Sequence, residues 1–167
     1  EPMLVEKLTR LVCRRDEDLF AEDLERHRAQ LADQIRDSRV LVIGGAGSIG
    51  AATVKVLLSF RPKTLHVIDQ NENGLAELVR DLRSSVEARN LVDFRTLPLN
   101  FGSPIMRRFM LEEEAYDHVL NFAALKHVRS EKDPCSILQM LDTNVVKPAQ
   151  LLRWIVERGA PKTYFCV

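Results

Sequence analysis

Five short apolar runs alternate along the chain with longer stretches in which apolar residues recur every three or four positions. The runs are mostly uninterrupted, as expected for strands covered on both faces, and the longer stretches have the period of amphipathic helices. This alternation predicts right-handed βαβ units, and therefore an α/β fold with a Rossmann-type, doubly wound parallel sheet of about five strands. The predicted strands are residues 40–43, 65–68, 94–99, 118–122 and 164–167, and the predicted helices are residues 48–60, 72–89, 103–114 and 134–157.

One more amphipathic helix precedes the first strand. Leu19, Phe20, Leu24, Leu31 and Ile35 recur at helical spacing among charged residues. We therefore expect an N-terminal helical extension over residues 1–38 and an α/β domain over residues 39–167. The extension packs either on that domain or on a neighbouring segment.

Composition narrows the classes of partner. The 167 residues carry 24 basic and 24 acidic side chains, which argues against nucleic acid or an anionic membrane surface as the main partner. The longest uncharged stretch, residues 40–54, is too short and too rich in glycine to span a bilayer, so we expect no membrane segment in this chain. Cys13, Cys135 and Cys166 are far apart and odd in number, which favours reduced thiols in the cytoplasm and argues against a metal site.

The sharpest motif is the loop at residues 44–50, Gly-Gly-Ala-Gly-Ser-Ile-Gly, which lies between a predicted strand and a predicted helix. Gly44 permits the tight turn, Gly47 lets a pyrophosphate approach the backbone, and Gly50 lets the helix pack closely. The N–H groups near Ser48 and Ile49 would point at the phosphates. A plain strand-to-helix turn and a methyltransferase loop are the alternatives, whereas a kinase-type loop is excluded because no Gly-Lys-Ser/Thr follows.

An acidic residue ends the second predicted strand. Asp69 lies 19 residues after Gly50, where a carboxylate accepts hydrogen bonds from the adenosine ribose of a dinucleotide. Residues 70–72 contain no Arg or Lys to pair with a 2′-phosphate, so NAD is favoured and NADP stays possible. The alternative for Asp69 is an ordinary turn-forming or helix-capping acid.

The ends of the third and fourth predicted strands lie at the same edge of the sheet, where open α/β sheets bind ligands. Asn100 is a candidate for the adenine amino edge, with Phe101 flanking the ring, although Asn100 is equally suited to capping a turn. Ala123 and Ala124 are small enough to let the backbone approach a cofactor.

Three polar residues beyond the fourth strand are further candidates. Lys126 and His127 overhang the place where a substrate would enter. They invite a catalytic assignment, because Lys can hold phosphate and His titrates near neutral pH, but a surface or loop-packing role is at least as plausible. Asn144 lies on a helix among apolar neighbours and would brace the loop after the fourth strand.

Together these motifs resemble those of the extended short-chain dehydrogenase/reductases. The resemblance rests on the glycine loop, on Asp69 with its Asn/Glu-rich turn, on the run Asn-Phe-Ala-Ala-Leu-Lys-His-Val at residues 121–128, and on Thr-Asn-Val at residues 143–145. Within this superfamily, the motifs most closely resemble those of the polysaccharide-biosynthesis branch, which contains UDP-N-acetylglucosamine 4,6-dehydratases and related epimerases. It covers residues 39–167.

The resemblance implies a function. A bound NAD(P) takes hydride from C4 of a nucleotide sugar such as UDP-N-acetylglucosamine. In a dehydratase, water then leaves across C5 and C6, and the hydride returns to C6. In an epimerase, the hydride returns to C4 on the opposite face of the sugar. We expect the full-length protein to be a homo-oligomer. Members of the superfamily usually take their acid/base from Tyr-x-x-x-Lys beyond the fifth strand. This chain contains no such motif. We therefore assign no catalytic residue and expect an inactive cofactor-binding portion, truncated before the catalytic segment and the substrate domain.

Two departures from the family pattern and two other functions remain to be weighed. Asn100 stands where relatives commonly carry Asp, and Lys147-Pro148 replaces a common Gly-Thr.

Two alternatives come from other functional classes. One is a non-catalytic NAD-binding module that regulates a partner through the leading helix, and the other is a methyltransferase.

Overall fold

The computed structural model describes residues 11–12, 21–83, 93–126 and 133–167. The chain divides into two compact units, Glu1–Gln34 and Ile35–Val167. Helix α2 (Ala21–Ile35) occupies most of the described part of the first unit, and its last residue is the first residue of the second. Its predicted first residues, 16–20, lie outside the described residues. The second unit contains the α/β domain.

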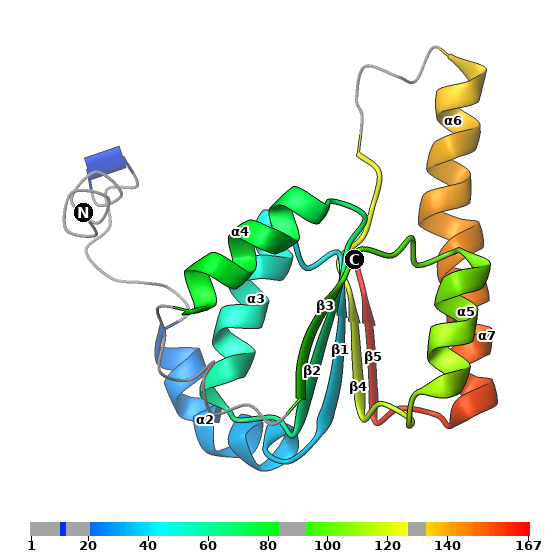
Figure 1. Ribbon diagram of the computed structural model, residues 1–167. Coiled ribbons are helices and arrows are strands. Elements are labelled where there is room, and N and C mark those ends of the chain that lie inside the picture. The colour runs from blue at the N-terminus through cyan, green and yellow to red at the C-terminus, as the bar shows by residue number, and fades with distance from the viewer. Residues whose placement is uncertain (1–10, 13–20, 84–92, 127–132) are drawn as a thin grey trace. The chain divides into compact units, whose positions relative to one another are not determined.

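The α/β domain is built on five parallel strands, as the sequence predicts (Figure 1). Their order is β3-β2-β1-β4-β5, so the order reverses between β1 and β4, as in a Rossmann fold. The third and fourth strands end earlier than predicted, at Leu97 and Asn121. The strands are β1 (Arg39–Ile43), β2 (Thr64–Ile68), β3 (Asp93–Leu97), β4 (His118–Asn121) and β5 (Thr163–Cys166).

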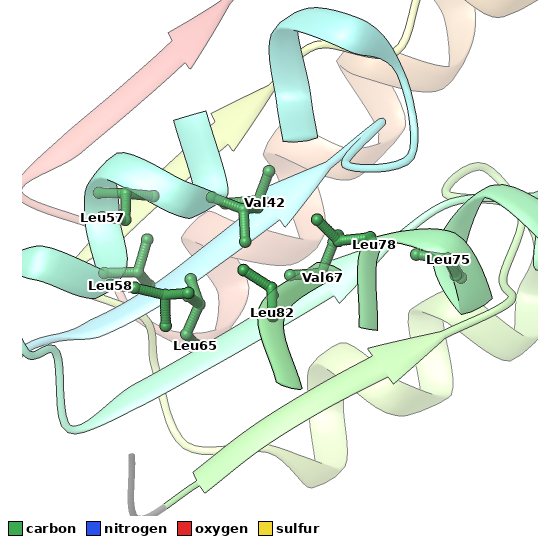
Figure 2. Packing of buried hydrophobic residues seen from close by; sticks show 10 residues of the cluster. Val42, Leu57, Leu58, Leu65, Val67, Leu75, Leu78 and Leu82 are labelled. Carbon is green, nitrogen blue, oxygen red and sulfur yellow. The ribbon is translucent and has the colours of Figure 1, made fainter. Parts of the chain in front are cut away.

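Helices cover both faces of this sheet, which is why the central strands read as continuous apolar runs (Figure 1). On one face, α3 (Ser48–Ser59) and α4 (Glu72–Arg83) pack on β1 and β2, and Figure 2 shows the leucines of both helices meeting Val42, Leu65 and Val67. The residues predicted to extend α4, 84–89, lie outside the described ones.

On the other face, α5 (Pro104–Glu112) and α7 (Lys147–Arg158) form a second core with β1, β2 and β4. Leu41, Met106 and Leu151 lie fully buried within it. Burying each such side chain contributes about 1.5–3 kcal/mol, so the two cores hold the strand ends in fixed positions.

The predicted helix 134–157 is interrupted. It consists of α6 (Pro134–Leu141), a π-helical turn η2 (Asp142–Val146) and α7. Pro148 explains the interruption, because it has no N–H and its ring clashes with the carbonyl four residues earlier. The backbone widens instead, and Lys147 donates its N–H to the Asp142 carbonyl five residues back.

A buried polar cluster lies toward the amino ends of β2 and β3. His66 is fully buried; its Nδ1 lies 2.6 Å from the Tyr116 hydroxyl, and its Nε2 accepts from Arg95 Nε at 2.9 Å. Arg95 in turn donates to Glu113 at 2.8 Å, and Asp93 lies 3.1 Å from His66 Nε2. A ring protonated on Nδ1 would accept from Arg95 and donate to the Tyr116 hydroxyl, whereas a ring protonated on Nε2 would donate to Asp93.

This cluster makes stability depend on pH. Burial first, and the Arg95 charge second, lower the pKa of His66. As the pH falls through the ordinary histidine pKa of about 6.5, the unfolded chain takes up a proton that the folded chain resists. We therefore expect the free energy of unfolding to fall between about pH 7.5 and pH 5.5, by at most about 1.4 kcal/mol, the contribution of one proton over this window.

Urea denaturation at the two pH values measures this effect, with His66→Gln as the control because glutamine retains hydrogen-bonding groups but does not titrate. The drop should be smaller in the variant by the contribution of one proton. An equal drop in both proteins would show that His66 is not responsible.

Candidate cofactor-binding site

A cleft of about 570 Å³ opens at the carboxyl ends of β1, β2, β3 and β4. It spans the point where the strand order reverses, which is where open α/β sheets bind their ligands. A second pocket of about 340 Å³ shares Gly44, Gly47 and Ala124 with the first and adds Ser48, Ile49 and Lys126. The shared residues make the two pockets parts of one continuous cleft.

The glycine loop forms the floor of this cleft, and its three motif glycines differ in their surroundings. Gly44 has φ +76°, and a Cβ there would lie 2.6 Å from the backbone N of Ala123. A Cβ on Gly50 would overlap the Gly44 carbonyl. A Cβ on Gly47 would meet only the Gly44 carbonyl oxygen, at 3.4 Å, so the space in front of Gly47 is open. Gly44 and Gly50 therefore shape the loop, whereas Gly47 leaves room for a ligand.

The N-terminus of α3 faces the same space. Gly47 is the N-cap residue and provides no side-chain cap, so the amides of Ser48 and Ile49 in the first turn are left for another acceptor. Lys126 is exposed and lines the second pocket together with these two residues. A helix N-terminus and a lysine at one place form a site suited to a phosphate group.

Asp69, which follows β2, is hydrogen-bonded to the glycine loop. Its Oδ2 accepts from the Ala46 N–H at 2.9 Å, and its Oδ1 accepts from the Asn71 N–H at 2.9 Å. The turn-forming role weighed above is therefore present. Asp69 also lines the larger pocket, and each carboxylate oxygen has a second lone pair for a ligand.

The turn after β3 contributes two of the predicted residues to the cleft. Asn100 lines the cleft, and its Oδ1 accepts from the Gly102 N–H at 3.0 Å, so it caps the turn. Phe101 is only 2% exposed and belongs to the second core. It also lines the cleft, but with little exposed surface, and its predicted contact with an adenine ring stays a prediction.

The end of β4 is held by two asparagines. Asn121 is fully buried, and its Oδ1 accepts from the Ala123 N–H at 3.0 Å. Asn144 Oδ1 accepts from the Leu125 N–H at 2.8 Å, and its Nδ2 donates to the Leu125 carbonyl at 3.0 Å. The predicted bracing of this loop by Asn144 is confirmed. Ala124 lines both pockets beside it, and His127 lies outside the described residues.

The sequence profile of a family described as polysaccharide biosynthesis protein matches residues 40–163. The chain belongs to this family. The resemblance to extended short-chain dehydrogenase/reductases is confirmed by relatives and solved structures that include nucleotide-sugar epimerases. The chain thus combines the family's sequence with a cleft at the position where open α/β sheets bind their ligands.

Three similar proteins illustrate the relationship. A protein of Methanocaldococcus jannaschii described as an uncharacterized membrane protein is 35% identical over 76% of this chain and 35% of its own length. UDP-glucose 4-epimerase 1 of Oryza sativa subsp. japonica is 36% identical over 75% of this chain and 34% of the epimerase. The solved UDP-glucose-4-epimerase from Stenotrophomonas maltophila, with bound NAD and formylated UDP-arabinopyranose, is 31% identical with TM-score 0.58, covering 73% of this chain and 34% of that one. The chain spans about a third of the length of these relatives.

The cleft has further lining residues that the sequence analysis did not identify as candidate ligands. Gln139, Thr143 and Lys147 line the larger pocket from the helical column α6–η2–α7. Their spacing of four residues is the signal that would have found them. The Lys147 stem packs over Gly102, and its ammonium pairs with Asp142 at 3.1 Å.

Two other kinds of site were sought in the part of the chain that the structure describes. That part contains no group of three or more His, Cys, Asp or Glu side chains placed to hold a metal ion. It also contains no helix of the length and hydropathy needed to cross a bilayer.

Proposed function

We propose that this domain binds NAD(H) as the cofactor portion of a nucleotide-sugar 4,6-dehydratase of the UDP-N-acetylglucosamine type, in polysaccharide biosynthesis. The observation that carries the proposal is the convergence of the α3 N-terminus, Asp69 and Lys126 on one cleft at the β1/β4 reversal. Nucleotide-fold proteins place a dinucleotide at this position. The printed name of the Stenotrophomonas structure, which includes bound NAD, supports the same ligand.

The residues present fit such a cofactor. The open space at Gly47 accommodates a pyrophosphate, to which the Ser48 and Ile49 amides would donate. Lys126 would add a positive charge at the same end. Asp69 would accept from an adenosine ribose hydroxyl with the lone pairs that its two backbone donors leave free.

Further cleft residues would complete the cofactor site. Asn100 would contact the adenine through its amide, while Ala123 and Ala124 present short side chains to the cofactor. Asn144 contributes through the backbone of Leu125, which it holds at both polar groups. Phe101 supports the site from the core.

NAD is favoured over NADP. The Asp69 carboxylate lines the adenosine end of the cleft and would repel a 2′-phosphate, and residues 70–72, Gln-Asn-Glu, supply no compensating positive charge. Gln70, which lines the same pocket, is neutral.

When bound, NAD supplies the hydride acceptor and donor for the sugar carbon. The chain's own contribution is to hold that cofactor, because no Tyr-x-x-x-Lys pair is present in the sequence to move a proton. We therefore expect no 4-keto product when this chain is incubated with NAD and UDP-N-acetylglucosamine, whereas turnover would refute the assignment of a purely cofactor-binding role.

A nucleotide-sugar 4-epimerase is the second candidate for the parent activity. It is favoured by the two relatives whose printed names are UDP-glucose 4-epimerase. Both activities begin with the same oxidation at C4 and use the same cofactor cleft, so the NAD proposal does not depend on the choice. The run of residues 121–128 favours the dehydratase.

Calorimetric titration tests the cofactor assignment. We expect this chain to bind NAD, to bind NADP more weakly, and not to bind S-adenosylmethionine. Failure to bind either dinucleotide would overturn the proposal, and selective binding of S-adenosylmethionine would replace it with a methyltransferase. ADP-ribose serves as the control ligand, because it contains every group that the described cleft is proposed to contact.

A further inference from the structure

One wall of the larger pocket contains a backbone oxygen that is left without its usual helical donor. In an α-helix the carbonyl of residue 143 accepts from the N–H of residue 147, and in a π-helix it accepts from the N–H of residue 148. Lys147 donates its N–H to the Asp142 carbonyl instead, and Pro148 has no N–H to donate. Within the described column α6–η2–α7, neither of these two donors therefore reaches the Thr143 carbonyl.

The surface of the column that carries this oxygen faces the cleft. Gln139, Thr143 and Lys147 are spaced by four residues, and all three line the larger pocket. A helical carbonyl points along the axis toward the residue four positions ahead, so the Thr143 oxygen lies on the side that Thr143 and Lys147 share. The Thr143 hydroxyl accepts from Gln139 Nε2 at 3.0 Å. The carbonyl is thus an additional acceptor at the cleft wall.

The same stretch of the column adjoins the turn that follows β3. Lys147 packs its stem over Gly102, where an added Cβ would lie 2.6 Å from Lys147 Cδ. The Lys147 ammonium pairs with Asp142 at 3.1 Å, which holds it at the column. Asn100, two residues before Gly102, lines the same pocket. Asn100 and the Thr143 carbonyl therefore belong to adjoining walls of one space.

Asn100 contributes a donor to this space. Its Oδ1 accepts from the Gly102 N–H at 3.0 Å, and the other end of the carboxamide, Nδ2, can only donate. An aspartate at this position would present a second acceptor oxygen instead. The asparagine therefore removes an acceptor from the pocket, whereas Pro148 exposes one on the adjoining wall. These two positions are both departures from the family pattern, and their effects compensate each other.

We propose that the Thr143 carbonyl accepts a hydrogen bond from the 6-amino group of the NAD adenine, and that Asn100 Nδ2 donates to a neighbouring ring nitrogen. The inference rests on the proposed binding of NAD and adds the groups that select its base. Adenine carries a donor at position 6 beside ring nitrogens that accept, which matches one acceptor and one donor in the cleft. Pro148 is a positioning residue, because it acts through Thr143 and is not among the described residues that line the pocket.

Calorimetric titration with NAD and with deamino-NAD, which has hypoxanthine in place of adenine, tests the inference. Hypoxanthine presents an oxygen at position 6, which would face the Thr143 oxygen and leave both without a donor. We expect NAD to bind at least about tenfold more tightly. Equal affinities would overturn the inference and leave the proposed function intact, whereas binding of neither dinucleotide would overturn both.

Pro148→Ala tests the role of the freed carbonyl. An N–H at residue 148 would reach the Thr143 carbonyl directly in a π-turn, and in an α-helix the Lys147 N–H would return to it. The preference for NAD over deamino-NAD should therefore fall several-fold, and an unchanged preference would overturn the inference. Damage to the fold would weaken both ligands alike, so the ratio of the two affinities reports the base contact. Pro104→Ala is the matched control and should keep the ratio, because Pro104 lies in the first turn of α5, where an N–H has no helical acceptor.

Two further variants separate the Thr143 carbonyl from other acceptors on the same walls. Asn100→Asp combined with Pro148→Ala should recover the preference for NAD, because the carboxylate supplies an acceptor in place of the occupied carbonyl. No recovery in a folded double variant would overturn the proposed compensation. Gln139→Leu removes the side-chain oxygen of Gln139 from this wall and should keep the preference. Loss of the preference in Gln139→Leu would assign the amino group to Gln139 and overturn the role of Thr143.

Discussion

Replacing Gly47 by Asp should abolish NAD binding and slightly stabilise the fold. A Cβ at Gly47 meets only one carbonyl oxygen, at 3.4 Å, so the new side chain has room. Gly47 is the N-cap of α3, where Asp accepts from first-turn amides and is worth a few tenths of a kcal/mol more than Gly. The new carboxylate would take the Ile49 amide, and it would repel the pyrophosphate from both the Ser48 and Ile49 amides.

The expected loss of affinity is at least about 100-fold, since two hydrogen bonds to a charged group contribute about 1.5–3 kcal/mol each. Calorimetry measures the affinity, and thermal unfolding without ligand measures the stability. Gly47→Ala is the matched control and should lose much less affinity, because it adds a methyl group without charge. NAD binding by Gly47→Asp at the wild-type affinity would contradict the proposed phosphate position.

Replacing Gly44 by Val should destabilise the fold itself, whereas Gly47→Asp should affect mainly NAD binding. At φ +76° a residue with a Cβ costs about 1–2 kcal/mol. That Cβ would also lie 2.6 Å from the Ala123 N and 2.8 Å from the Phe122 carbonyl carbon, and this backbone is held where the Phe122 N–H donates to the Ile43 carbonyl at 2.8 Å. Moving it adds about 1–3 kcal/mol.

We therefore expect the free energy of unfolding to fall by about 3 kcal/mol or more for Gly44→Val, measured by urea denaturation. Gly159→Val is the control, because Gly159 also has a positive φ, +146°, but a Cβ there meets only the Ala115 side chain, at 3.3 Å. Gly44→Val should cost clearly more. Equal costs would show that the close approach of β4 is unimportant.

The sequence by itself determined the features that depend on local chemistry. Apolar runs identified five strands and the longer periodic stretches identified the helices, because burial on both faces or on one face leaves a direct mark on residue order. The glycines of residues 44–50 were also recognisable, since positive φ and close approach each exclude a Cβ. The two-part pattern of loop and Asp69 located the cleft.

The tertiary structure alone decided which partner each polar side chain takes. Asp69 bonds to Ala46 across 23 residues, Lys147 packs over Gly102, and Phe101 lines the cleft while almost wholly buried in the core. Such contacts depend on which distant segments the sheet order brings together, and residue spacing along the chain does not record that. The exposure of apolar residues such as Leu138 and Val156 on α6–η2–α7 is of the same kind, because the packing of these helices on the sheet determines which apolar side chains are left uncovered.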